Sequence, residues 1–188
     1  MASSTKKSNK SRGFQSLLPP KLLPLGKVAI FVDAANILYS QQTIGWKVDY
    51  KKMIELFKKE LDVIFAGFYY GQVSTNQGQK NFFSMLKDRG YTIRTKPVKY
   101  IKTPKGIILK GNLDIELAFD LLTLKEKFDT CILLSGDSDF EILVKHLRTL
   151  KKQVIVVSAK KHISIELIRN CDKYVNLKKL RELIERKN

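Results

Sequence analysis

The sequence predicts an α/β protein, a three-layer α/β/α sandwich with a mostly parallel central sheet of about five strands. Short apolar runs that do not alternate with polar residues recur along the chain, for example KVAIFV from Lys27 and QVIVVS from Gln153. Such runs are typical of strands that are buried on both faces. Segments with the apolar spacing of amphipathic helices separate these runs, and strands that alternate with helices indicate a parallel sheet.

The elements are expected in the following order. Strands are predicted over residues 27–32, 63–70, 91–96, 128–134 and 153–158, with a small strand at 174–175. Helices are predicted over residues 50–61, 80–89, 113–126, 140–147, 163–169 and 177–186. Residues 99–110 (KYIKTPKGIILK) predict a β-hairpin that turns at Pro104-Lys105-Gly106, because proline and glycine favour tight turns.

The chain of 188 residues is long enough for one domain, which we place at residues 26–176. Residues 1–25 are basic, polar and interrupted by prolines, and they predict a disordered tail. Residues 177–188 predict a basic amphipathic helix that packs on the domain or extends it. The formal net charge of +17 favours a polyanionic partner, with nucleic acid first.

Several classes of protein are excluded by composition. No apolar run approaches the roughly 20 residues that cross a bilayer, so no membrane partner is expected. The two cysteines, Cys131 and Cys171, have neither disulfide-scaffold nor metal-ligand spacing, which is typical of a reducing compartment. The basic start lacks the uninterrupted apolar core of a secretory signal. A cytoplasmic location is therefore predicted.

Acidic residues follow two of the predicted strands at their carboxyl ends. Asp33 comes directly after the first strand, and Asp137 and Asp139 follow the strand over 128–134 through the turn Ser135-Gly136. In open α/β sheets, ligands bind at the carboxyl ends of the strands. One aspartate there would be most simply a helix N-cap, and Asp33 alone could equally be a turn residue. Together they indicate a shared site.

A fourth carboxylate, Asp114, falls on the predicted helix 113–126. At about 100° per residue, Leu117, Leu121 and Leu122 cluster around the direction of Asp114, whereas Asp120 points to the polar side. An unpaired carboxylate on an apolar face is costly. Asp114 is thus a cap, the partner of a cation such as Lys110, or a metal ligand.

Four carboxylates at one sheet edge repel one another unless a cation neutralises them. Oxygen ligands without cysteine or histidine favour Mg²⁺ or Mn²⁺ over Zn²⁺. Such ions can activate water and stabilise the oxygens of a phosphodiester. Two other classes fit less well. A phosphatase of the haloacid dehalogenase type needs a second aspartate where Ala35 stands, and a nucleotide-binding Rossmann protein needs glycines after the first strand.

Three segments carry a family resemblance: FVDAAN at 31–36, KGNLDIELAFDLL at 110–122 and SGDSDF at 135–140. Together they resemble the signature segments of the NYN domain, a family of the PIN-like nuclease superfamily that includes the LabA/DUF88 proteins. The resemblance implies a metal-dependent endoribonuclease; its alternative is a catalytically silent RNA-binding protein of the LabA type. The implied catalytic and metal-binding residues are Asp33, Asp114, Asp137 and Asp139, with Asn36 and Ser135 as supports and Asp120 in second rank.

Basic residues recur along the predicted hairpin and point to a nucleic-acid surface. Such a run is commonly only a solvated face, but nucleases that cut at an acidic site also need cations for the phosphate backbone and aromatic rings for the bases. The candidate RNA-binding residues are Lys96, Lys99, Tyr100, Lys102, Lys105 and Lys110. The predicted terminal helix is a second, weaker candidate. The sequence leaves a homodimer open.

Overall fold

The computed structural model describes residues 13–73, 76–103 and 106–187. Six strands form a central sheet in the order β3-β2-β1-β6-β7-β8, and every neighbouring pair is parallel. The strands are β1 (Lys27–Asp33), β2 (Asp62–Tyr69), β3 (Thr92–Arg94), β6 (Thr130–Leu134), β7 (Gln153–Ser158) and β8 (Lys173–Asn176). The predicted α/β class is confirmed, with six strands in place of about five because the small strand near residue 174 joins the sheet.

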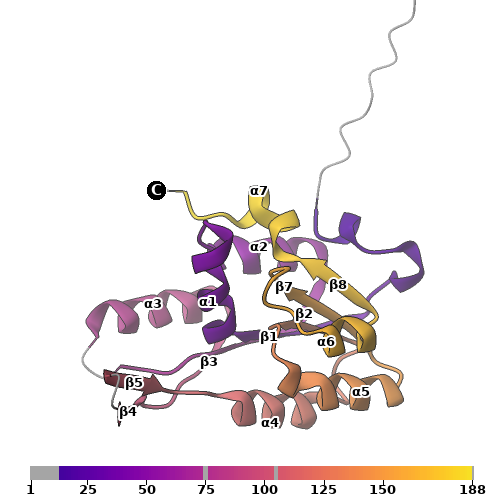
Figure 1. Cartoon of the computed structure of the whole chain (residues 1–188). Coiled ribbons are helices and arrows are strands. Elements are labelled where there is room, and N and C mark those ends of the chain that lie inside the picture. Colours follow the sequence, from indigo (N-terminus) through magenta and orange to yellow (C-terminus); the bar gives the residue numbers. More distant parts are fainter. Residues whose placement is uncertain (1–12, 74–75, 104–105, 188) are drawn as a thin grey trace, which may run out of the picture.

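Helices cover both faces of the sheet and complete three layers (Figure 1). One face packs against α1 (Ala34–Ile44), α2 (Tyr50–Glu60), α3 (Gln77–Asp88) and α7 (Arg181–Ile184). The other face packs against α4 (Asp114–Leu124), α5 (Glu141–Thr149) and α6 (Ile165–Asn170).

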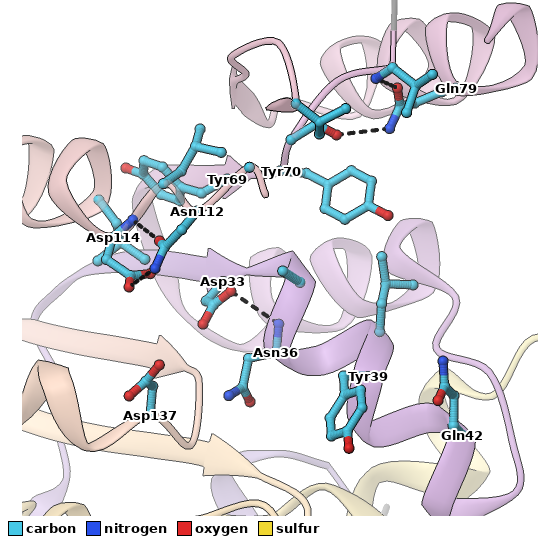
Figure 2. A pocket seen from close by; sticks show the side chains of 18 residues that line it. Asp33, Asn36, Tyr39, Gln42, Tyr69, Tyr70, Gln79, Asn112, Asp114 and Asp137 are labelled. Carbon is cyan, nitrogen blue, oxygen red and sulfur yellow. Dashed lines mark hydrogen bonds between the residues drawn. The ribbon is translucent and has the colours of Figure 1, made fainter. Parts of the chain in front are cut away.

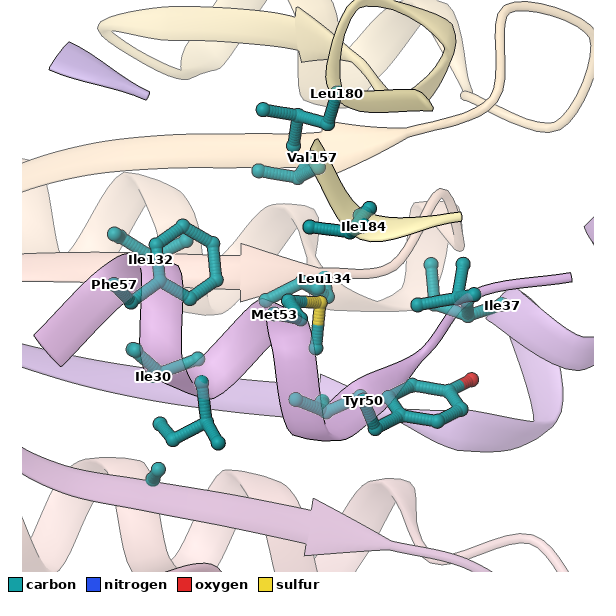
Figure 3. Packing of buried hydrophobic residues seen from close by; sticks show 14 of the residues in the cluster. Ile30, Ile37, Tyr50, Met53, Phe57, Ile132, Leu134, Val157, Leu180 and Ile184 are labelled. Atoms are coloured by element: carbon teal, nitrogen blue, oxygen red, sulfur yellow. The ribbon is translucent and has the colours of Figure 1, made fainter. Parts of the chain in front are cut away.

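The apolar runs of the sequence are explained by these two layers. In β1, Ile30 belongs to the hydrophobic cluster under α2, whereas Phe31 belongs to the cluster under α4. Successive side chains of a strand point to opposite faces, so a strand covered on both sides must be apolar at every position. Figure 3 shows Ile30 beside Met53 and Phe57 of α2.

The order of the strands reverses between β1 and β6. The chain runs from β1 outward to β2 and β3, and then returns to place β6 on the other side of β1. Val32 pairs with Leu134, so Asp33 and Ser135 are the next residues at the ends of two adjacent strands. Such a reversal opens a crevice at the carboxyl edge of an α/β sheet.

The predicted hairpin forms a separate two-stranded antiparallel sheet of β4 (Lys99–Thr103) and β5 (Gly106–Lys110). Residues 104–105, at its predicted turn, lie outside the described residues. Its base packs against the end of β2, because a Cβ on Gly71 would lie 3.0 Å from the Gly111 carbonyl oxygen and 2.7 Å from Val98. The absence of a Cβ at these two glycines therefore allows the base of the hairpin to pack closely at the carboxyl edge of the sheet.

Helix α1 is the one large element that the sequence analysis did not predict. Its apolar spacing is weak, and its eleven residues, AANILYSQQTI, have several polar side chains. The signals that define it lie at its ends. Asp33 caps its first turn through the Asn36 amide, and Gly45 ends it with a φ of 77°.

The prediction of a disordered tail through residue 25 is wrong for residues 13–25. Phe14, Leu18, Leu22 and Leu25 are buried in the core, and Phe14 meets Phe57 edge to face at 4.9 Å. The prolines limit this segment to two short 3-10 turns, Gln15–Leu17 and Pro20–Leu22, without preventing burial of its leucines. Residues 1–12 lie outside the described residues.

The C-terminal segment packs on the domain. Instead of one helix over 177–186, it forms a 3-10 turn (Leu177–Leu180) followed by α7, and both bury apolar residues against the α2 side of the sheet. Among the described residues, no helix is both long and apolar enough to cross a membrane.

Candidate active site

Asp33 is the last residue of β1 and the N-cap of α1. Its Oδ1 accepts a hydrogen bond from the Asn36 amide at 3.1 Å, and its Oδ2 accepts one from Ser135 Oγ at 2.8 Å. The side chain is 8% exposed, although it opens into a cavity at the edge of the sheet. Asp33 is thus a desolvated carboxylate that neighbouring elements hold in place.

The turn after β6 is tied to the same helix start. The Gly136 amide donates to Asn36 Oδ1 at 3.1 Å, and the Asp137 amide donates to Ser135 Oγ at 3.2 Å. Asp137 caps the next turn, because its Oδ1 accepts from the Asp139 amide at 3.0 Å. Asn36 and Ser135 thus join the start of α1 to the turn after β6, and their implied role as supports for a ligand or phosphate stays a prediction.

Gly136 leaves no room for a side chain. A Cβ there would lie 1.6 Å from the His162 carbonyl oxygen, and the Gly136 carbonyl accepts a hydrogen bond from the Ser164 amide at 2.9 Å. The loop between β7 and α6 thus packs directly against the turn that carries Asp137.

Asp114 opens α4 and faces the same cavity from the opposite layer. Its amide donates to Asn112 Oδ1 at 2.7 Å, and its carboxylate accepts from Asn112 Nδ2. This reciprocal pairing fixes Asp114 at the first turn of the helix. The side chain is half-buried, at the edge of the apolar stripe on which the helical-wheel projection of residues 113–126 places it.

The structure brings the predicted carboxylates together. Oxygens of Asp114, Asp137 and Asp139 lie within 4.8 Å of one another. Asp33 lies outside that group of three but lines the same cavity as Asp114 and Asp137 (Figure 2). We call the following four residues the acidic cluster: Asp33, Asp114, Asp137 and Asp139.

Burial and mutual repulsion make the cluster electrostatically unfavourable without a cation. Desolvation, with smaller contributions from the charges of Asp114 and Asp137, raises the pKa of Asp33 to about 6. Desolvation also raises the pKa of Asp114, and the charges of Asp137 and Asp139 add to the effect. In both carboxyls these effects outweigh the hydrogen bonds that favour the ionised form, from Asn36 and Ser135 to Asp33 and from Asn112 to Asp114.

A divalent cation fits this set of donors. Two oxygens on opposite sides of one Mg²⁺ are about 4.2 Å apart, twice the usual bond length of about 2.1 Å. Carboxylate oxygens within 4.8 Å of one another therefore need only small side-chain adjustments to share an ion. All candidate ligands are oxygens, which is the preference of Mg²⁺ and Mn²⁺.

Asp120 does not point to a polar surface, and this part of the helical-wheel prediction is wrong. It is 8% exposed and forms a two-pronged ion pair with Arg94, at 2.7 and 3.0 Å, while Tyr69 donates to it at 2.9 Å. The buried stripe of α4 is rotated toward Asp120, and Leu122 is 38% exposed. Asp120 ties α4 to β2 and β3 and is not part of the acidic cluster.

The predicted basic residues lie along the segment that leads to Asp114. Lys99 is exposed, whereas Lys96 forms an ion pair with Glu116 at 3.0 Å. Lys110 ends β5, four residues before Asp114. The side chains of Tyr100, Lys102, Lys105 and Lys110 lie outside the described part of the chain.

Sequence reasoning missed several residues that line the cavity. Tyr39 and Gln42 lie on α1, and Tyr70 lies across the cavity just after β2. The Asp33 cap and the Gly45 stop could have revealed α1, because they bracket a helix of typical length. No sequence signal places Tyr70 near them, because this proximity depends on the folded sheet.

Comparisons with known proteins agree with this architecture. A family model described as NYN domain matches residues 27–178. The low amplitude and bright protein LabA of Synechococcus elongatus is 34% identical over 165 residues, which covers 85% of this chain and 88% of that protein. A protein of unknown function from Vibrio parahaemolyticus has a similar crystal structure, with a TM-score of 0.69, 28% identity, and coverage of 81% of this chain and 93% of the other.

Proposed function

The chain belongs to the NYN domain family, and we propose that it is a divalent-metal-dependent endoribonuclease that hydrolyses RNA at the acidic cluster. One observation carries the proposal: three carboxylates from two different elements meet within 4.8 Å at the switch point of the sheet. Local burial and repulsion among these carboxylates disfavour their ionised forms, so a bound cation is the simplest reason to gather them at one site.

The ligands of the cation would be Asp114, Asp137 and Asp139, with Asp33 beside them. When bound, Mg²⁺ or Mn²⁺ would lower the pKa of water and offset the negative charge of the phosphodiester. Ser135 and the Asn36 amide hold the Asp33 carboxylate in one orientation, so it needs no rearrangement when substrate arrives.

We assign the binding of the RNA phosphate backbone to the hairpin of β4 and β5. Its base, formed by Val98 and Gly111, lines the same cavity as the acidic cluster. Lysines along the hairpin would bind phosphates next to the scissile bond and offset the repulsion between RNA and the carboxylates. Water would then attack phosphorus as the P–O bond to the leaving ribose oxygen breaks. The attacking water would lose a proton and the leaving oxygen would gain one from solvent, without a covalent intermediate on the protein.

The test is cleavage of labelled RNA and DNA, single-stranded and duplex, with Mg²⁺, Mn²⁺ or EDTA. Asp137→Asn removes one charge and keeps the cap to the Asp139 amide, because asparagine caps helices as well as aspartate does. Cleavage should fall by orders of magnitude, while RNA affinity holds or tightens. Asp88→Asn is the matched control, since this exposed carboxylate ends α3 at the opposite edge of the sheet.

Two outcomes would contradict the proposal. Full activity of Asp137→Asn would mean that Asp137 serves as an N-cap and does not bind a catalytic metal. Absence of metal-dependent cleavage on every nucleic acid, with RNA binding retained, would leave an RNA-binding protein without turnover.

A further inference from the structure

We propose that Tyr39 is a stacking platform for one unpaired nucleobase, so that the nucleic acid bound beside the acidic cluster is single-stranded. The proposal rests on the proposed function for the position of the scissile phosphate, and it assigns the part of the cavity that the carboxylates do not use. Four observations carry it: the size of the cavity, the exposure of Tyr39, the way its ring is held, and the lack of charge on the walls around it.

The cavity is much larger than a metal site requires. Its volume is about 600 Å³, and it extends from the acidic cluster along α1. Ala35, Tyr39 and Gln42 line it together, as the i, i+4, i+7 spacing of one helix face requires. Tyr39 is six residues beyond Asp33, an axial rise of about 9 Å. A ligand that reaches both ends must therefore be larger than a hydrated ion.

Tyr39 is exposed to an unusual degree for an aromatic ring in a cavity. The side chain is 64% exposed. Its ring lies 5.4 Å from the His162 ring with an interplanar angle of 89°, and His162 Nε2 lies 2.8 Å from Thr43 Oγ1. The Tyr39 ring is thus oriented by a neighbour that is itself anchored, which reduces the entropy lost when a ligand stacks on it.

The opposite wall is also aromatic and neutral. Tyr70 lies across the cavity with its ring 6.3 Å from Phe83, and Val98 also lines the cavity. Figure 2 shows the labelled carboxylates on one side of Asn36, and Tyr39, Tyr70 and Gln42 on the other. The Gln42 side chain is exposed and can pair with the polar edge of a base.

The distribution of charge separates the two ends of the cavity. Asp33, Asp114 and Asp137 are the charged residues among the described residues that line it, and all three lie at one end. No described residue that lines the Tyr39 end is a cation that could pair with a phosphate, whereas a neutral base gains stacking and hydrogen bonds there. In a duplex both faces of each base are already stacked, so only an unpaired base can offer a face to Tyr39.

The test measures binding in the Asp137→Asn background, where cleavage does not interfere. The probes are a fluorescent single-stranded RNA, the same RNA as a duplex, and a single-stranded DNA. Tyr39→Ala should weaken single-strand binding by about 5- to 150-fold, the range found for loss of one base–aromatic stack. Tyr39→Trp should retain the affinity. Duplex affinity should stay the same.

Phe119→Ala is the matched control. Phe119 lies on the outer surface of α4, is 68% exposed and does not line the cavity. A second readout locates the base: abasic positions are introduced one at a time along the RNA. At one position, removal of the base should weaken binding to the protein that retains Tyr39 as much as Tyr39→Ala weakens binding to the intact RNA. Combining the abasic RNA with Tyr39→Ala should weaken binding no further.

The outcomes distinguish this inference from the proposed function. If the wild type cleaves RNA but Tyr39→Ala binds as tightly as the parent, or loses duplex binding equally, the stacking site is wrong and the nuclease stands. If the wild type never cleaves but single-strand binding depends on Tyr39, turnover is wrong and the stacking site stands. If no nucleic acid binds, both are wrong.

Discussion

Ser135 Oγ donates a hydrogen bond to Asp33 Oδ2 at 2.8 Å and thereby joins the ends of the adjacent strands β6 and β1. The same oxygen accepts from the Asp137 amide at 3.2 Å. One buried hydroxyl thus contacts two residues of the acidic cluster, the carboxylate of Asp33 and the backbone of Asp137. Its position follows from the strand register, because Val32 pairs with Leu134.

Ser135→Ala should destabilise the fold and weaken cation binding. The change removes the donor to Asp33 Oδ2 and the acceptor of the Asp137 amide, and leaves the Asn36 amide as the donor to Asp33 Oδ1. Loss of a hydrogen bond to a buried charged group costs about 1–3 kcal/mol. Urea unfolding at pH 8 in EDTA and calorimetric titration with Mn²⁺ measure the two effects. Ser138→Ala, at an exposed serine of the same turn, is the control, and equal behaviour of the two variants would contradict the supporting role.

The raised pKa of Asp33 predicts how metal-free stability depends on pH. The folded protein holds the Asp33 proton more tightly than the unfolded chain, with a pKa of about 6 against 3.8. The contribution of this group to the free energy of unfolding therefore falls as pH rises from about 4 to about 6, by about 3 kcal/mol at about 1.4 kcal/mol per pKa unit. Above pH 6 the full penalty remains.

The measurement is the difference in unfolding free energy between Asp33→Asn and the wild type in EDTA, taken from pH 4 to pH 8. This subtraction cancels the titration of shared groups that do not interact with Asp33; Asp114 and Asp137 do interact with it. The difference should increase in favour of Asp33→Asn up to about pH 6 and then level off. Saturating Mn²⁺ should reduce it above pH 6, because the cation offsets the buried charge. A difference that does not vary with pH would contradict the prediction.

Replacing the hairpin lysines Lys99, Lys102 and Lys105 with alanine should weaken RNA binding and flatten its salt dependence. Each lost phosphate contact removes about one unit from the slope of log K against log salt. RNA affinity at several salt concentrations measures the slope. The hairpin is a sheet separate from the core, so the melting temperature should not change.

The matched control for charge is the triple alanine variant of Lys59, Lys87 and Lys127. All three are exposed and precede β2, β3 and β6, at the opposite edge of the sheet from the acidic cluster. This variant should lose less affinity although its net charge is the same. If both triple variants lose affinity equally, the hairpin is only one part of a diffuse basic surface.

Gly136→Ala should destabilise the protein by about 3 kcal/mol or more. The added Cβ would lie 1.6 Å from the His162 carbonyl oxygen, so the backbone of one loop must move. Gly78→Ala is the control, because among the described residues its Cβ would meet only Asn76 Oδ1, at 3.4 Å, in an exposed part of α3. That variant should be unchanged or gain about 0.5–1 kcal/mol. Chemical unfolding compares the two, and similar stability would contradict the close packing of the loop.

The α/β class and the strands of the central sheet could be predicted from the amino-acid sequence alone. Apolar residues at every position of a strand can be satisfied only by two covering layers, which is a local requirement that the sequence displays. The sequence also placed Asp33 and Asp137 at strand ends, because each directly follows such a run. These features depend on neighbours in the chain, and reading them requires no knowledge of distant contacts.

The set of residues that share the cavity could not be predicted in this way, because it depends on the folded chain. Asp120 is buried because Arg94, on a different strand, pairs with it, and a wheel drawn from α4 alone cannot include that partner. Phe14 is buried because it packs against Phe57 of α2, a residue that is distant from it in the sequence. Tyr39 and Tyr70 face one cavity because β2 lies beside β1 in the sheet. Such contacts join residues distant in sequence, and local propensity does not encode them.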